Sequence, residues 1–273
     1  MAAYRFEIGY DGRDFAGWAA QPGRRTVQGE LEAALEKILQ RPARLTVAGR
    51  TDAGVHALAQ VASVELDREP PSDLAWRLNG LLGPDVGVRS FEPAPEGFDA
   101  RRWARSRTYL YRVLTGPVPD PFEAGRALWV PRPLDEPAMF ECADSLAGEH
   151  DFTAFTPTDT KHSRFRRNVL ASSWEREGER LLAFRITADA YLRSMVRVLV
   201  GSMLEAGEGR RDADGFRALL EGAPRSAAGR TAPAHGLYLE AIELGDGPAF
   251  DRTATSSAAH GPQSEVSEGD SPA

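Results

Sequence analysis

Near its amino terminus the chain reads Arg5-Phe6-Glu7-Ile8-Gly9-Tyr10, in which polar and apolar side chains alternate. A repeat of two residues is typical of a β-strand that buries one face. Asp11-Gly12 follows and predicts a turn. The next segment has helical spacing instead: its apolar side chains fall on one face, Thr26 supplies an amino-terminal cap, and we expect the helix to run to about Gln40.

The remainder of the chain repeats this alternation of strand-like and helix-like segments. In the first half we expect strands over 45–48, 57–66 and 86–91, and a helix that Ser72 caps and that ends near Leu82. In the second half we expect strands over 108–114, 169–174, 181–187 and 237–244, and helices over 135–146, 191–206 and 212–222. The order strand, helix, strand, strand, helix in each half predicts two α+β units of ferredoxin-like (RRM-like) type, and the hairpin connections predict a largely antiparallel sheet.

The length of 273 residues allows one large domain or two small ones. We expect an N-terminal α+β half over 1–105, a C-terminal α+β half over 106–245 and an acidic tail over 246–273. The tail is rich in Ser, Gly, Pro and Ala and has almost no large apolar residues. Such a segment cannot bury enough surface to offset the entropy of ordering it, so we expect it to be disordered.

Composition excludes several classes of protein. Cys142 is the only cysteine, so the chain has no intramolecular disulfide and no zinc site built on paired cysteines. The five histidines are scattered without metal-ligand spacing. No apolar run approaches the roughly 18 residues of a membrane span, and the first ten residues lack the pattern of a secretory signal. We therefore expect a cytoplasmic protein without a metal and without a membrane partner.

The chain carries 33 basic and 40 acidic residues, which gives a net charge of −7. A negative total argues at first against a nucleic-acid partner. The tail, however, holds five of the acids and only one of the bases. Lys37 and Lys161 are the only lysines, so the positive charge is almost entirely arginine, which suits bidentate phosphate contacts and stacking on bases. A GC-rich genome would also favour arginine over lysine. Whether the chain binds a nucleic acid therefore has to be judged from the local distribution of its arginines.

The segment Ala48-Gly49-Arg50-Thr51-Asp52-Ala53-Gly54-Val55-His56 lies between two predicted strands and carries the first candidate site. Its two glycines permit tight turns and a close approach of the backbone to a ligand. Asp52 is ionised at neutral pH, the more so beside Arg50, and an ionised carboxylate can attack carbon or act as a base. The alternative is a local turn in which Asp52 bonds its own backbone. His56 is interpreted as a structural histidine.

A basic segment over 101–112 is the second candidate. It holds three aromatic residues and five arginines, namely Arg101, Arg102, Arg105, Arg107 and Arg112. Arginines neutralise phosphates and aromatic faces stack on exposed bases, so Arg101, Arg105 and Arg107 are candidate RNA-binding residues. Two alternatives stay open: a solvated arginine run beside an ordinary strand, and pairing with the chain's own carboxylates.

A smaller basic cluster falls on a predicted loop and includes Lys161 and Arg164. Arg197 lies four residues after Arg193, on the same side of the helix over 191–206. These residues would line a second flank of an RNA-binding groove. The segment over 151–155 is interpreted as structural, an aspartate turn with two packed phenylalanines.

Taken together, the motifs resemble the tRNA pseudouridine synthase A family over most of the chain before the tail. The matching blocks, in order, are Tyr10-Asp11-Gly12 with Phe15-Ala16-Gly17-Trp18, Thr26-Val27-Gln28-Gly29, Ala48 through His56, Tyr109-Leu110-Tyr111, Asp151-Phe152-Thr153-Ala154-Phe155, Met195-Val196-Arg197 with Val200-Gly201-Ser202, and His235-Gly236-Leu237-Tyr238-Leu239. The resemblance implies two ferredoxin-like halves that share one continuous antiparallel sheet, with a cleft between them.

The same resemblance implies a homodimer that isomerises uridines 38, 39 and 40 of the tRNA anticodon stem-loop to pseudouridine, without metal or organic cofactor. Asp52 falls on the family's catalytic aspartate. Arg50 falls on the arginine that pairs with this aspartate and intrudes where the flipped base was. Tyr109 falls on the active-site tyrosine that stacks on the target base.

The sequence leaves the first chemical step open: Asp52 attacks uracil C6, attacks ribose C1′, or removes the C2′ proton to give a glycal. Two other functions compete. A non-catalytic RNA-binding protein with two RRM-like units would explain the arginine–aromatic segment but gives Asp52 no role. An acid–base hydrolase would pair Asp52 with Asp11 to cleave a glycosidic bond, but leaves the basic groove unexplained.

Overall fold

The computed structural model of the chain describes residues 1–160 and 162–249. The RNA contact expected of Lys161 lies outside this part of the chain. So does nearly all of the segment 246–273, for which disorder is predicted. Among the described residues, no helix combines the length and the apolar character needed to cross a membrane.

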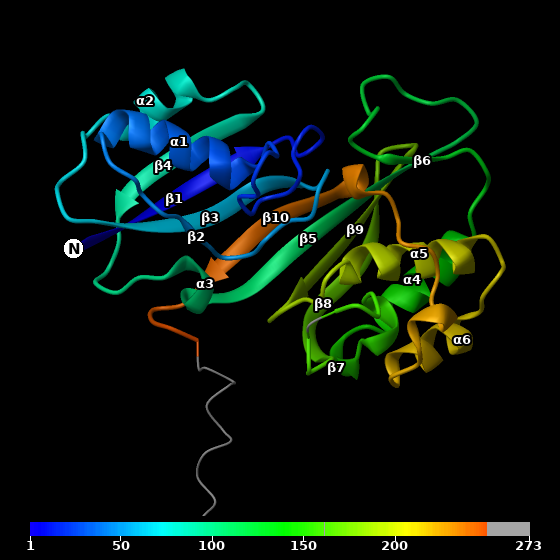
Figure 1. Cartoon of the computed structure of the whole chain (residues 1–273). Coiled ribbons are helices and arrows are strands. Elements are labelled where there is room, and N and C mark those ends of the chain that lie inside the picture. Colours follow the sequence, from blue (N-terminus) through cyan, green and yellow to red (C-terminus); the bar gives the residue numbers. More distant parts are fainter. Residues whose placement is uncertain (161, 250–273) are drawn as a thin grey trace, which may run out of the picture.

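Ten strands form one twisted sheet, shown in Figure 1. They are β1 (Ala2–Tyr10), β2 (Thr46–Val47), β3 (His56–Leu66), β4 (Val86–Pro93), β5 (Ala104–Thr115), β6 (Leu128–Val130), β7 (Gly148–Asp151), β8 (Arg166–Glu177), β9 (Leu181–Ala188) and β10 (Leu237–Leu244). The order across the sheet is β4-β1-β3-β10-β5-β9-β8-β7, with β2 on β3 and β6 on β5. Neighbours pair antiparallel, except that β10 runs parallel to β3 and β6 parallel to β5. The predicted, largely antiparallel sheet is therefore confirmed.

Each half has the same internal topology. In the first half the strands β1, β2, β3 and β4 lie in the order β4-β1-β3-β2, and in the second half β5, β8, β9 and β10 lie in the order β10-β5-β9-β8. Both orders read fourth, first, third, second, with helices between the first and second and between the third and fourth strands, so each half is a ferredoxin-like unit. The last strand joins them, because β10 pairs with both β3 and β5. The α+β fold class is confirmed, while the division at residue 105 stays a prediction.

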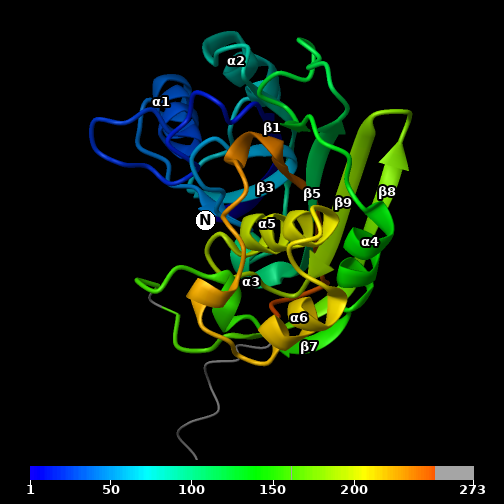
Figure 2. The same cartoon turned by 90° about the vertical axis from the view of Figure 1, so that its right-hand side faces the viewer.

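The helices are α1 (Val27–Leu39), α2 (Leu74–Leu81), α3 (Ala100–Trp103), α4 (Glu136–Asp144), α5 (Met195–Gly207) and α6 (Ala213–Arg217). The two longest, α1 and α5, cover the same face of the sheet, α1 over the N-terminal half and α5 over the C-terminal half (Figures 1 and 2). One hydrophobic core runs between sheet and helices through both halves and includes Phe6, Trp18, Tyr111 and Phe184. The opposite face carries charged ladders, such as Arg185 with three glutamates.

The helix boundaries follow local capping chemistry in most places. The side chains of Thr26, Asp135 and Asp212 each accept a hydrogen bond from the first turn of α1, α4 and α6, as the sequence predicts. Ser72 does not cap α2; the helix begins one residue later, after Asp73, whose carboxylate binds Arg77.

Helix α5 begins at Met195 and not at Tyr191. Ser194 adopts a left-handed conformation, with φ of 60°, which a right-handed helix cannot include. The strands β6 and β7 were not predicted, because three and four residues are too few to show a repeat. The interpretation of residues 151–155 is confirmed: the Asp151 carboxylate accepts bonds from Thr153, and Phe152 and Phe155 are fully buried.

Candidate active site

The loop over residues 48–56 connects β2 to β3 and is fixed from several sides. Gln60 of β3 donates from Nε2 to the Gly49 carbonyl at 2.7 Å, and the Thr51 hydroxyl lies 2.7 Å from the hydroxyl of Tyr10. The turn after β1 also packs against it, since a Cβ on Gly12 would lie 1.9 Å from the carbonyl oxygen of Val55. A side chain at position 12 would therefore push the loop away, so only glycine fits.

Asp52 stands on this loop and faces the amino terminus of α5. Its side chain is 40% exposed, and its Oδ2 lies 3.7 Å from Nη1 of Arg197. The Ser194 hydroxyl donates to the same oxygen at 3.4 Å. Both partners belong to the start of α5, where the helix dipole favours a negative charge. Within the described residues the carboxylate makes no hydrogen bond to its own loop, so the geometry is not that of the local turn considered as the alternative.

Arg50 is exposed and has no side-chain hydrogen bond or ion pair within the described part of the chain. The cation that neighbours Asp52 is Arg197, whereas the resemblance implies Arg50. Thr51, which separates the two residues, is buried and points toward Tyr10.

Tyr109 of β5 lies beneath the same loop. Its ring is 8% exposed and packs edge-on against Tyr191, with centroids 4.8 Å apart. A Cβ on Gly49 would lie 3.9 Å from the Tyr109 hydroxyl, which makes no hydrogen bond with the described residues. Burial raises the pKa of Tyr109 well above its ordinary value, and the negative charge of Asp52 acts in the same direction. The phenol next to Asp52 is therefore protonated at neutral pH.

The basic residues predicted to bind RNA differ in their surroundings. Arg101, Arg105 and Arg164 are exposed. Arg107 instead turns its guanidinium toward backbone carbonyls, including that of Ala48 at 2.7 Å. Arg197 lies against Asp52 and donates from Nε to the Ala232 carbonyl at 2.7 Å. The structure thus brings Asp52, Tyr109 and Arg197 together and leaves three of the arginines on the surface.

Arg112 shows that pairing with the chain's own carboxylates accounts for part of the basic segment. Its two terminal nitrogens donate to the two carboxylate oxygens of Glu123 at 2.7 and 2.9 Å.

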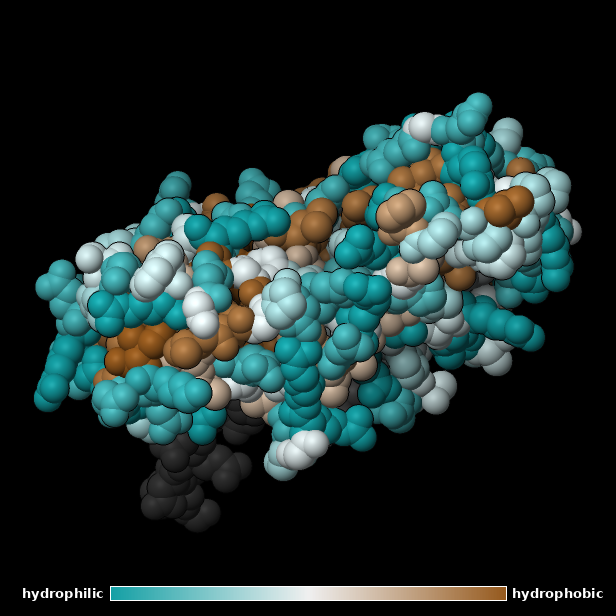
Figure 3. Space-filling model, turned by 90° about the horizontal axis from the view of Figure 1, so that it is seen from above, coloured by the Kyte–Doolittle hydropathy of each residue, from teal (hydrophilic) through white to brown (hydrophobic). Residues whose placement is uncertain are grey.

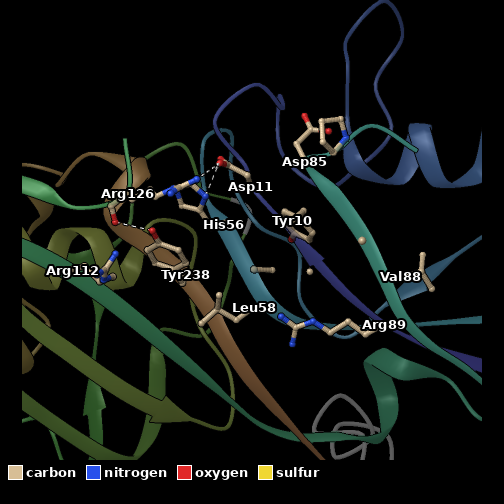
Figure 4. A pocket seen from close by; sticks show the side chains of 14 residues that line it. Tyr10, Asp11, His56, Leu58, Asp85, Val88, Arg89, Arg112, Arg126 and Tyr238 are labelled. Carbon is tan, nitrogen blue, oxygen red and sulfur yellow. Dashed lines mark hydrogen bonds and ion pairs between the residues drawn. The ribbon is translucent and has the colours of Figure 1, made fainter. Parts of the chain in front are cut away.

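A pocket of about 510 Å³ is formed by strands of both halves and is shown in Figure 4. Leu58, Arg112 and Tyr238 line it together with Asp11 and His56. Since side chains alternate along a strand, Arg112 faces away from α5, on the opposite side of the sheet from Tyr109 and Tyr111. Neither Asp52 nor Tyr109 belongs to this pocket.

His56 and Asp11 have structural roles there. His56 is 3% exposed, accepts at Nδ1 from the backbone N–H of Gly12, and donates from Nε2 to the His235 carbonyl at 3.1 Å. Burial lowers its pKa, which keeps the ring neutral. The Asp11 carboxylate binds Arg13 at 2.7 Å. Asp11 therefore points into a different environment from Asp52, and the two carboxylates do not form the pair that a hydrolase requires.

The sequence did not single out four residues of the site, namely Gln60, Tyr10, Tyr191 and Ser194. Gln60 carried a usable signal, because it is a lone amide within an apolar strand and is fully buried in the structure. Ser194 carried none, since nothing local distinguishes it from a surface serine. No group of three or more His, Cys, Asp or Glu side chains suited to a metal ion occurs among residues 1–160 and 162–249.

Comparison with known proteins identifies the family of this chain. A family model described as tRNA pseudouridine synthase matches residues 8–101 and 142–243. A protein of Frankia casuarinae named tRNA pseudouridine synthase A is 47% identical over 246 residues, which cover 88% of each chain. Proteins of the same name from Leifsonia xyli subsp. xyli and Rhizobium meliloti are 42% and 40% identical, and the matches cover 88% and 89% of this chain and 90% and 100% of theirs. Asp52 and Arg197 lie within the segments that the family model matches, and Tyr109 lies between these segments. The chain belongs to the tRNA pseudouridine synthase family and is an isomerase that acts on tRNA.

Proposed function

We propose that the protein converts uridines 38, 39 and 40 of the tRNA anticodon stem-loop to pseudouridine, with Asp52 as the catalytic carboxylate. The observation that carries the proposal is the placement of Asp52: its carboxylate is partly exposed, makes no hydrogen bond to its own loop among the described residues, and lies against Arg197 and Ser194 at the start of α5. A carboxylate in this position can reach a nucleoside from solvent and act as a nucleophile or base.

The reaction breaks the C1′–N1 bond of uridine, turns the uracil and forms a C1′–C5 bond. The C5 proton leaves to water and N1 takes up a proton, so the product is an isomer of uridine. The target base must first leave the stack, which costs a few kcal/mol. Contacts between arginines and phosphates offset this cost. Asp52 then attacks C6 or C1′, or takes the C2′ proton. These three routes place the same demand on the carboxylate, namely that it is charged and reaches the flipped nucleoside.

Tyr109 acts on the detached uracil. Its ring offers an apolar surface for stacking, and its hydroxyl is free to donate a hydrogen bond to a uracil oxygen. Because burial raises the pKa of Tyr109, the phenolate is scarce at neutral pH. The hydroxyl is therefore better suited to donate a hydrogen bond than to remove the C5 proton as a base.

Arg50 is the residue we assign to the gap that the flipped base leaves in the RNA. It is exposed on the loop of Asp52 and has no partner among the described residues that it would have to give up. A planar guanidinium stacks well on neighbouring bases. The exposed Arg101, Arg105 and Arg164 then serve as phosphate contacts, together with Lys161.

We also propose that the protein acts in the cytoplasm as a homodimer. Large apolar side chains are exposed at Trp76 on α2 (76%) and at Phe122 (86%), which leaves surface for a second subunit to cover. Figure 3 shows separate hydrophobic areas on a mostly hydrophilic surface. Light scattering after size-exclusion chromatography should give twice the chain mass. A monomer at micromolar concentration would contradict the dimer and leave the enzymatic proposal intact.

One assay tests the reaction. Unmodified tRNA with tritium at uracil C5 is incubated with the protein, and isomerisation releases tritium to water while the RNA chain stays intact. Asp52→Asn should bind tRNA with unchanged affinity and release almost no tritium. Substantial turnover by this variant would refute the role of Asp52. A non-catalytic RNA-binding protein would release no tritium in the wild type, and a hydrolase would leave abasic or cleaved RNA.

A second set of substrates locates the reacting positions. In each of them one of the uridines 38, 39 and 40 is replaced by cytidine.

A further inference from the structure

Arg107 of β5 has an unusual set of partners for an arginine beside an RNA-modifying site. Its Nε and Nη2 donate to the Ala48 carbonyl at 3.1 and 2.7 Å, and Nη1 donates to the Asp189 carbonyl at 2.9 Å. Longer bonds run from Nη1 to the Ala104 carbonyl at 3.3 Å and from Nη2 to the Arg101 carbonyl at 3.4 Å. A guanidinium has five N–H donors. Each of them is used on the backbone, so none remains for a phosphate.

The four carbonyls come from three separate parts of the fold. Ala48 begins the loop that carries Asp52, Arg101 lies in α3 and Ala104 directly after it at the start of β5, and Asp189 follows β9. Two positions after Arg107 on the same strand is Tyr109. The guanidinium therefore connects the loop of Asp52 with the strand of Tyr109.

Gln60 holds the neighbouring position of the loop from the other side. It is fully buried, and its Nε2 donates to the Gly49 carbonyl at 2.7 Å. Two consecutive carbonyls, those of Ala48 and Gly49, are thus held by side chains of β5 and β3. Both donors act directly before Arg50 and Asp52, where a small displacement of the backbone changes the position of both side chains.

We propose that Arg107 is a positioning residue, which with Gln60 fixes the loop so that the Asp52 carboxylate meets Arg197 and Tyr109, and that it is not a contact to tRNA phosphate. The inference rests on the proposed role of Asp52. It assigns the basic segment two functions: the exposed Arg101 and Arg105 face the RNA, and Arg107 shapes the site. A misplacement of about 1 Å at a reacting group can cost on the order of a hundredfold in rate.

The test compares Arg107→Gln with Arg105→Gln in the full-length protein. Arg105 is the matched control, since it lies on the same strand, is exposed, and donates only to the Gly247 carbonyl among the described residues. Two quantities are measured for each variant: kcat and KM for tritium release, and the slope of log Kd for tRNA against log salt concentration. A lost phosphate contact reduces the magnitude of that slope by about one.

For Arg107→Gln we expect kcat to fall at least about tenfold with the salt slope unchanged, because one side-chain amide with two N–H donors cannot replace five donors in a plane. For Arg105→Gln, the reference for a lost phosphate contact, we expect the salt slope to fall by about one. A normal kcat for Arg107→Gln, or a salt slope reduced as in Arg105→Gln, would overturn the inference. These results are distinct from a failure of the proposed function, which would show as turnover by Asp52→Asn.

Gln60→Met provides a second variant in case Arg107→Gln does not fold. It keeps the length and burial of the side chain and removes the donor to Gly49. Thermal unfolding establishes that the variant is folded at the assay temperature. We expect a lower kcat with an unchanged KM and an unchanged salt slope, since only the presentation of the catalytic loop is altered. An unchanged kcat in this folded variant would overturn the proposal that carbonyl anchoring positions Asp52.

Discussion

Nη1 of Arg197 lies 3.7 Å from Oδ2 of Asp52, although the two residues belong to different halves of the chain. Arg197 is oriented for this contact by a second bond, from Nε to the Ala232 carbonyl at 2.7 Å. The contact joins the loop between β2 and β3 to the first turn of α5. The site therefore exists only when both ferredoxin-like halves are in place.

Arg197→Lys should lower kcat strongly while the protein stays folded. Lysine keeps the positive charge but loses the bond to Ala232 and the planar shape that directs Nη1 to Asp52. We expect a loss of about 10- to 100-fold in kcat with little change in KM, as for a group that acts on the reacting centre. Steady-state tritium release measures both constants. A raised KM with an unchanged kcat would instead point to a role in binding tRNA.

Tyr109→Phe should separate catalysis from stability. The Tyr109 hydroxyl has no hydrogen-bond partner among the described residues, so its removal should change the free energy of unfolding by less than about 0.5 kcal/mol. The kcat should fall roughly tenfold or more, because a hydrogen bond to the uracil is lost. Tyr109→Leu serves as the comparison: it also removes the ring that packs on Tyr191, so both stability and kcat should fall. Full activity of Tyr109→Phe would limit the residue to stacking.

Alkaline pH should destabilise the protein through its buried tyrosines. Burial raises the pKa of Tyr10 to about 12 and raises the pKa of Tyr109 and Tyr111 as well. In the unfolded chain a tyrosine ionises near pH 10. The folded state then holds more protons than the unfolded state, so the stability contributed by these groups is complete below about pH 10 and is lost as the pH rises toward the folded-state values.

Two measurements check this expectation. Urea unfolding at increasing pH should give a free energy of unfolding that declines above about pH 10. Absorbance at 295 nm should show these phenols ionising at higher pH in the folded protein than in urea. A single titration near pH 10 for all tyrosines of the folded protein would contradict the prediction.

The start of α1 offers a test of the helix boundaries. Oγ1 of Thr26 accepts a hydrogen bond from the Gly29 N–H at 3.2 Å, so Thr26→Ala should cost about 1 kcal/mol of stability. Ser72→Ala is the matched control, because Ser72 does not cap α2 and should leave stability within about 0.5 kcal/mol of the wild type. Thermal or urea unfolding of the two variants measures whether Thr26 stabilises its helix as a cap and Ser72 does not. Equal losses would mean that Ser72 does cap a helix in solution.

Elements with local causes could be predicted from the sequence. Alternating side chains define β1, capping residues define the starts of α1, α4 and α6, and the final strand over 237–244 has the predicted bounds. The loop of Asp52 was also identified, because its glycines, arginine and aspartate stand together in the chain. These features depend on neighbours within a few residues, which a linear pattern records directly.

The groups that surround Asp52 could not be predicted in the same way, because they depend on the packed fold. It placed Arg197 beside the carboxylate and left Arg50 exposed, it turned Arg107 inward to four carbonyls, and it inserted β10 between β3 and β5. An arginine can direct its five N–H donors to phosphate, carboxylate or backbone oxygen, and its position in the sequence does not say which of these it meets. The choice depends on which oxygen the packed fold brings within bonding distance, and segments far apart in the sequence supply those oxygens.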